Sequence, residues 1–261
     1  MATIETAWDD SGQPSAEDLE RWKMVRSMVH EMRSVLTAAK IGAEMLTGPR
    51  ADDAGYRRGY AQMIAEQTGR VARLLEDFSE LTRPAWSEAP VGEEIADLNV
   101  ALDAAGRELA GLASNLEQDL ILTPSPAAAL INGHQGRVTQ ALRGLLEYLL
   151  VSSPRGSAVE ARVDLATGEA DAATVTILRR RPDENDTGEQ TLDWSRVSPA
   201  VARRIVADHG GFLEASDTGE SLSLVATFPR KRGVGADALP VAENSSADLI
   251  YLPRLRMAAQ G

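Results

Sequence analysis

The chain has 261 residues, a formal net charge of −12 at pH 7, and 43% hydrophobic but only 4% aromatic residues. This length suffices for two modest domains, and the scarcity of aromatics favours helical packing. The acidic balance argues against nucleic-acid binding. The absence of cysteine excludes disulfides, and the three histidines lack metal-ligand spacing. No apolar stretch approaches the ~20 residues of a membrane span, so we expect a soluble, cytoplasmic protein without a membrane partner.

Residues 1–15 are polar and predict a flexible leader that ends where Ser15 can cap a helix. From Ala16 to Thr47, apolar side chains recur at alternating steps of three and four, which is typical of a bundle or coiled-coil helix. Gly48 in a left-handed conformation and Pro49 predict the end of this helix. The apolar stripe consists of Trp22, Val25, Val29, Met32, Leu36, Ala39, Ala43 and Leu46.

A second amphipathic helix is expected from Ala54 to Thr82, capped by Asp52 or Asp53 and ended by the Arg83–Pro84 dipeptide. Two long helices joined by a short turn form an antiparallel hairpin, here residues 16–83. Because a lone hairpin cannot bury both apolar stripes, we expect two copies to pair as a homodimeric four-helix bundle.

Residues 84–92 contain two prolines and a glycine and predict a linker. Residues 93–230 alternate helical and strand-like patterns, which favours an α/β sandwich. The expected fold class is therefore α+β, with a helical hairpin followed by an α/β sandwich. Residues 231–261 are expected to be a disordered tail or a short appendage. The predicted helices are Leu98–Asn115, Gln135–Leu150 and Pro199–His209, and the predicted strands are Val159–Leu165, Thr174–Leu178, Phe212–Ala215 and Leu222–Phe228.

On the first helix, His30 follows the stripe residue Val29, so its ring should lie beside the seam and within reach of solvent. Glu31 is adjacent and can accept a proton from one ring nitrogen, which leaves the other nitrogen free to attack a phosphoryl group. From the spacing alone, an ordinary surface histidine fits this pattern better.

Residues 29–37, with the sequence VHEMRSVLT, resemble the H-box of two-component sensor histidine kinases, usually written HELRTPLT. The resemblance implies that His30 is the phosphoacceptor and Glu31 its general base. Ser34 falls where the family places Thr or Asn to position a water that dephosphorylates a partner regulator. Val35 replaces the usual proline, which removes a helix kink and no catalytic group.

Residues 138–154 resemble the N-box helix of the kinase ATP-binding domain, and residues 200–215 resemble the helix, turn and strand that close it. Gly144 and Tyr148, however, stand at the two asparagine positions of the N-box, the second of which binds Mg²⁺ in the family. Tyrosine is a poor ligand for this cation. Residues 179–188 and 196–199 also lack the glycine pairs with which the family contacts adenine and phosphates.

The resemblance therefore implies a two-component protein in which His30 exchanges phosphoryl groups with a response-regulator receiver domain. We expect impaired ATP binding, no bound cofactor or metal, and an upstream phosphodonor kinase as a further partner. Two alternatives stay open. One is an ATP-dependent autokinase that uses Mg-ATP, with Arg179, Arg180 and Arg181 holding phosphates; the other is a non-catalytic pseudokinase scaffold. His134 and the turn beginning at His209 are assigned no chemistry.

Overall fold

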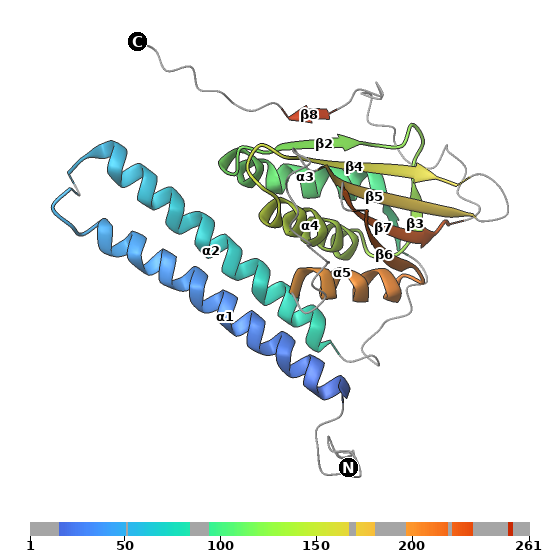
Figure 1. The fold of residues 1–261 in the computed structure, drawn as a ribbon, viewed down its shortest axis with the longest axis horizontal. Coiled ribbons are helices and arrows are strands. Elements are labelled where there is room, and N and C mark those ends of the chain that lie inside the picture. Colours follow the sequence, from blue (N-terminus) through green and yellow to red (C-terminus); the bar gives the residue numbers. More distant parts are fainter. Residues whose placement is uncertain are drawn as a thin grey trace, which may run out of the picture. The chain divides into compact units, whose positions relative to one another are not determined.

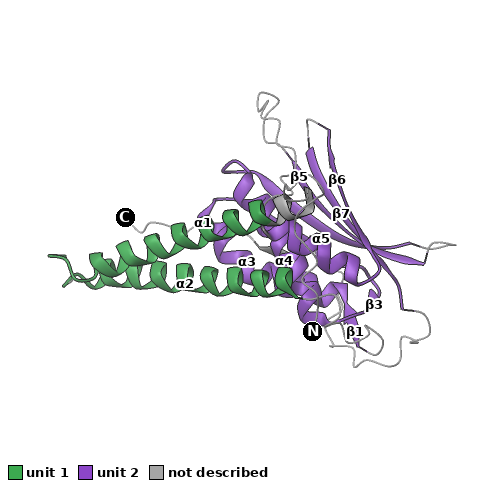
Figure 2. Ribbon diagram, turned by 90° about the horizontal axis from the view of Figure 1, so that it is seen from below, with its two compact units in different colours: residues 1–84, 194–197 green, residues 85–193, 198–261 purple. Residues whose placement is uncertain are grey.

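The protein divides into two compact units, one of residues 1–84 with 194–197 and one of residues 85–193 with 198–261 (Figure 2). The predicted leader, the linker and most of the predicted tail lie outside the described residues, so those domain boundaries stay predictions. The computed structural model describes residues 16–50, 52–83, 94–166, 171–180, 197–218, 221–231 and 250–252.

The first unit is a hairpin of two long helices, α1 (Ala16–Met45) and α2 (Ala54–Thr82) (Figure 1). Asp53 caps α2 by accepting the backbone N–H groups of Gly55 at 2.8 Å and Tyr56 at 3.1 Å. The prediction for Gly48 was wrong, because its φ is not positive. The N–H groups of Thr47 and Gly48 instead bond to carbonyls three residues back, so the helix ends in a tightened 3₁₀ turn that requires no left-handed residue.

The face of α1 that packs on α2 carries Met28, Val35 and Gly42, seven residues apart. Met28 and Val35 are 2% and 4% exposed. A Cβ at Gly42 would lie only 2.6 Å from the Met63 Cε atom, so glycine permits the close approach of the helices. The sequence pattern did not identify this face.

The predicted stripe of α1 lies instead on the outside of the hairpin. Four of its large residues are 40% to 70% exposed in the single chain, whereas Met32 and Leu46 are half-buried. An apolar stripe of this length, left uncovered by α2, is the feature that a second helical hairpin would cover. We call these residues the outer stripe: Trp22, Val25, Val29 and Leu36.

The second unit is a two-layer α/β sandwich, in which helices lie on one face of a six-stranded sheet (Figure 1). The strand order is β6-β7-β5-β4-β2-β8; β2 and β4 are parallel and the other neighbours are antiparallel. Two short strands, β1 (Ile95–Asp97) and β3 (Leu130–Asn132), pair separately. The helices are α3 (Leu98–Asn115), α4 (Gln135–Ser152) and α5 (Val197–Asp208), and the sheet strands are β2 (Asp119–Thr123), β4 (Ala158–Leu165), β5 (Ala172–Arg180), β6 (Phe212–Asp217), β7 (Ser221–Pro229) and β8 (Ile250–Leu252).

The core of this unit lies between the helices and the sheet. Strands β5 and β7 alternate buried and half-buried residues, and their buried residues pair across the ladder, as Val175 does with Ala226. Leu142 and Leu146 of α4 are fully buried as well. The predicted fold, a helical hairpin followed by an α/β sandwich, is confirmed. No helix among the described residues has the length and apolarity to cross a membrane.

Candidate functional site

His30 lies on the exposed surface of α1, in the first unit. Its predecessor Val29 belongs to the outer stripe and is 50% exposed, whereas Met28 is buried inside the hairpin. The ring therefore leaves the helix beside the outer stripe and can be reached by another molecule. Ser34 is also exposed, one turn further along the same helix face.

Glu31 is turned toward the second helix of the hairpin. Arg70 of α2 donates from Nη2 to the Glu31 Oε1 atom at 2.8 Å, and the two side chains are about one-third exposed, at 33% and 35%. This ion pair fixes the Glu31 carboxylate beside the helix turn that carries His30. The sequence does not predict Arg70 at this site, because its position opposite Glu31 depends on the register of the hairpin.

In the second unit, Gly144 and Tyr148 lie on α4, and both are buried. A Cβ at Gly144 would lie 3.3 Å from the Ser198 Cβ atom in the first turn of α5. The missing side chain therefore lets α5 pack directly on α4, where Pro199 and Ala200 are buried too. At these two positions, α4 offers neither the carboxylate nor the amide oxygens that Mg²⁺ prefers.

The arginines at the end of β5 are used in different ways. Arg179 is 1% exposed and donates from Nη1 to the Ser152 carbonyl at 3.3 Å, near the C-terminal end of α4. Arg180 is exposed and pairs with Glu160 at 3.3 Å. Arg181 lies outside the described residues. The autokinase alternative assigned Arg179 to phosphate binding, but this residue is buried and its guanidinium satisfies a helix-terminal carbonyl inside the fold.

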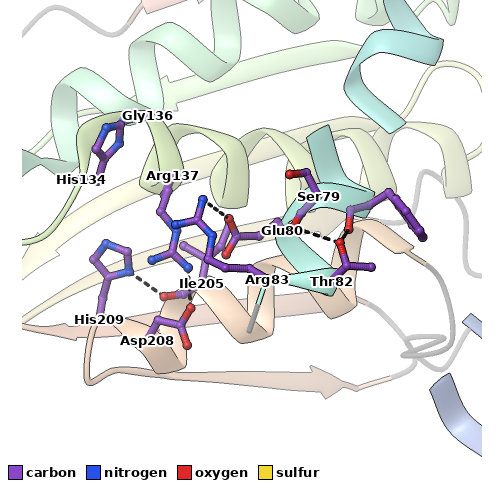
Figure 3. Close-up of polar contacts among 11 residues, drawn as sticks. Ser79, Glu80, Thr82, Arg83, His134, Gly136, Arg137, Ile205, Asp208 and His209 are labelled. Atoms are coloured by element: carbon purple, nitrogen blue, oxygen red, sulfur yellow. Dashed lines mark hydrogen bonds and ion pairs between the residues drawn. The ribbon is translucent and has the colours of Figure 1, made fainter. Parts of the chain in front are cut away.

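The remaining two histidines have structural partners (Figure 3). His134 accepts the Gly136 N–H at Nδ1 over 3.1 Å and caps α4. His209 is 7% exposed and donates from Nδ1 to the Ile205 carbonyl at 2.6 Å. Its ring packs over Gly133, where a Cβ would lie 2.0 Å from the His209 Cδ2 atom.

A buried ion pair joins α4 to α5 in the same region (Figure 3). The Arg137 Nη2 atom donates to the Asp208 Oδ2 atom, and the side chains are only 12% and 15% exposed. Within the described ranges, no three His, Cys, Asp or Glu side chains come close enough together to hold a metal ion.

No protein-family model matches the sequence. Among curated proteins, the chain is similar to the sensor-like histidine kinase SenX3 of Mycolicibacterium smegmatis, with 24% identity over 235 residues. It is also similar to the sensor histidine kinase MtrB of Mycobacterium tuberculosis, with 27% identity over 226 residues. These alignments cover 85% and 78% of this chain but only 60% and 38% of the relatives, so the chain spans part of their length.

Among solved structures, the histidine kinase AdeS of Acinetobacter baumannii aligns with a TM-score of 0.55 at 15% identity, over 77% of this chain and 98% of that chain. Full-length ShkA aligns with a TM-score of 0.50 at 12% identity, over 82% of this chain and 46% of that chain. The two structural alignments show a shared fold. The two relatives found by sequence are both named as sensor histidine kinases. The chain is therefore similar in sequence to sensor histidine kinases and shares the fold of histidine kinases.

Proposed function

We propose that this protein is a two-component phosphotransfer protein in which His30 exchanges a phosphoryl group with the receiver domain of a response regulator, without using ATP itself. The observation that carries this proposal is the exposed His30 next to a Glu31 carboxylate that Arg70 holds in place at 2.8 Å. In-line access and a positioned proton acceptor are the main requirements for phosphorylating an imidazole.

The transfer needs few groups from this chain. One ring nitrogen of His30 forms a bond to phosphorus while the acyl-phosphate P–O bond of the receiver breaks, and the electron pair returns to the receiver carboxylate. Glu31 accepts the proton that the other ring nitrogen releases. The receiver supplies the divalent cation that neutralises the phosphoryl oxygens. Ser34 takes no part in this transfer; its hydroxyl would orient a water only in a separate reaction, the hydrolysis of the phosphoryl group on the partner regulator.

Independence from ATP is supported by the contacts of α4. Gly144 and Tyr148 replace the two amide side chains expected from the resemblance, and Ser198 of α5 packs against the gap at Gly144. Isothermal titration of the full chain with Mg-ATP should give no saturable heat. Saturable binding, together with ATP-dependent labelling of His30, would make the protein an autokinase instead.

The outer stripe supports a homodimer as the working form. Trp22, Val25, Val29 and Leu36 step by three, four and seven residues along α1, as the seam of a coiled coil does. A second copy carries the same stripe, so a two-fold axis can cover both surfaces at once. The phosphoryl group would then originate in an upstream kinase and reach the dimer through a receiver.

The function as a whole is tested by transfer from a radiolabelled phosphorylated receiver to this chain. Label on the wild-type protein that is lost in His30→Ala is expected. Binding of the receiver without any transfer would instead identify a pseudokinase scaffold.

A further inference from the structure

We propose that Arg26 and Arg33 form an anion-binding site on either side of His30 that holds the phosphoryl group as it is transferred. This inference rests on the proposed role of His30 as phosphoacceptor. It assigns to two exposed arginines a direct contact with the phosphoryl oxygens, and it adds to the chemistry that Glu31 provides.

The geometry of α1 brings the three side chains together. Arg26 is four residues before His30 and Arg33 is three residues after it, so both are neighbours of His30 on one helix face, with Cβ atoms about 5–6 Å apart. Long helical side chains lean toward the helix N-terminus. Arg33 therefore leans back over His30, and His30 leans toward Arg26. All three are exposed to solvent.

The guanidinium groups of Arg26 and Arg33 are available for a ligand. Neither makes an ion pair or a side-chain hydrogen bond within the part of the chain that the structure describes. The acidic residue closest to them in sequence is Glu31, and its carboxylate is engaged by Arg70 of α2 at 2.8 Å. The pairing of Glu31 with Arg70 therefore leaves the positive charge around His30 available to an anionic ligand.

The local charge is opposite to that of the whole chain. Residues 21–33 contain four basic residues and a single acidic one, in a protein whose net charge is −12. A segment of this sign at the proposed phosphoacceptor attracts dianionic groups, and the flat guanidinium fork matches phosphoryl oxygens in a bidentate manner. The same cations would also offset the charge that accumulates on the phosphoryl oxygens during transfer.

The test uses phosphoramidate, a small phosphoryl donor, with the full chain. A ring nitrogen of His30 forms a bond to phosphorus, the bond to ammonia breaks, and the departing ammonia takes up the imidazole proton. The initial rate of phosphohistidine formation is followed by ³¹P NMR. The signal that disappears in His30→Ala is the signal of His30, which separates it from His134 and His209.

Arg26→Ala and Arg33→Ala should each lower this rate about fivefold, the effect of one unit charge about 4 Å from another in water. Arg26→Lys and Arg33→Lys should keep most of the rate, because the charge remains. Raising the salt concentration should slow the wild type toward the rate of the double alanine variant. Arg58→Ala is the matched control, since Arg58 is an exposed arginine on α2 near the hairpin turn.

Labelling of both alanine variants at the wild-type rate would overturn the anion site and leave His30 as the phosphoacceptor. An equal loss in Arg58→Ala would also overturn it, because the effect would then reflect total charge. If His30→Ala retains the full label, the proposed function itself fails, and this outcome is distinct from the other two. Circular dichroism of each variant confirms that α1 remains helical.

Discussion

The ring of His209 occupies the space that a side chain at position 133 would need. Gly133 has a φ of 150°, and a Cβ added to it would lie 2.0 Å from the His209 Cδ2 atom. His209 is held there by its bond to the Ile205 carbonyl and by the edge of Phe228, at a ring distance of 6.4 Å. At this site, a glycine and a histidine far apart in sequence depend on each other.

Gly133→Ala should therefore destabilise the protein by about 2 kcal/mol or more, because the substitution combines backbone strain with displacement of a buried ring. Gly111→Ala in α3 is the control. A Cβ at Gly111 meets nothing within 4 Å, so this variant should gain about 0.5–1 kcal/mol from helix propensity. Urea unfolding measures both changes, and equal stabilities of the two variants would contradict this packing.

Arg70 acts on the proposed chemistry only through Glu31. Because the pair is about one-third exposed, Arg70→Ala should change stability by less than about 1 kcal/mol. Transfer to His30 should nevertheless slow by about tenfold. This loss is smaller than the roughly 10²–10⁴-fold decrease in rate expected when the acid–base group itself is removed. Rescue by Arg70→Lys would support positioning by charge. A large loss of stability with an unchanged transfer rate would instead make Arg70 a structural residue.

The sequence predicts His30, Glu31 and Ser34 as neighbours because they share one helix. It does not predict Arg70, which is 39 residues away from Glu31. Such contacts depend on the register between helices, and the turn residues alone do not determine that register. Gly48 illustrates the same limit, because a glycine after a helix permits a left-handed cap without requiring one.

At the scale of elements, two contacts join α5 to α4, one near each end of α5. Ser198 packs against Gly144, and Arg137 pairs with Asp208. The helices and the four longer sheet strands follow from periodicity and apolar composition. Strands β1 and β3, with three residues each, are too short to produce a pattern and are set by their pairing in space.

The Arg137–Asp208 pair should be energetically coupled. Asp208→Ala and Arg137→Ala should each cost about 2–4 kcal/mol, because removal of one partner leaves a mostly buried charge. The double variant should cost about 1–3 kcal/mol less than the sum of the single variants. Thermal or urea unfolding of the four proteins of this cycle gives the coupling, and strict additivity would show that the pair contributes nothing.

At the scale of the whole molecule, α1 has two apolar faces. Met28, Val35 and Gly42 pack on α2, whereas the outer stripe is uncovered in the single chain. The sequence predicts that α1 has an apolar seam, but it does not reveal which face meets α2. Both faces have helical spacing, and only the packing of the hairpin distinguishes them.

Leu36→Glu should convert the proposed dimer into a monomer, because a charge in the seam would be buried without a partner. Light scattering measures the mass in solution. The control is Val100→Glu, which changes a 53% exposed residue of α3 in the other unit and should leave the dimer intact. If Leu36→Glu has the mass of a dimer, the outer stripe is not the interface.

The most direct measurement follows the phosphoryl group itself. Receiver domains from the source genome, each labelled with ³²P on its aspartate, are incubated with the wild-type chain and with His30→Ala. We expect label on the wild type that is stable in base and labile in acid, and none on His30→Ala. Absence of transfer from every receiver, or label that persists in His30→Ala, would contradict the assignment of His30 as the phosphoacceptor.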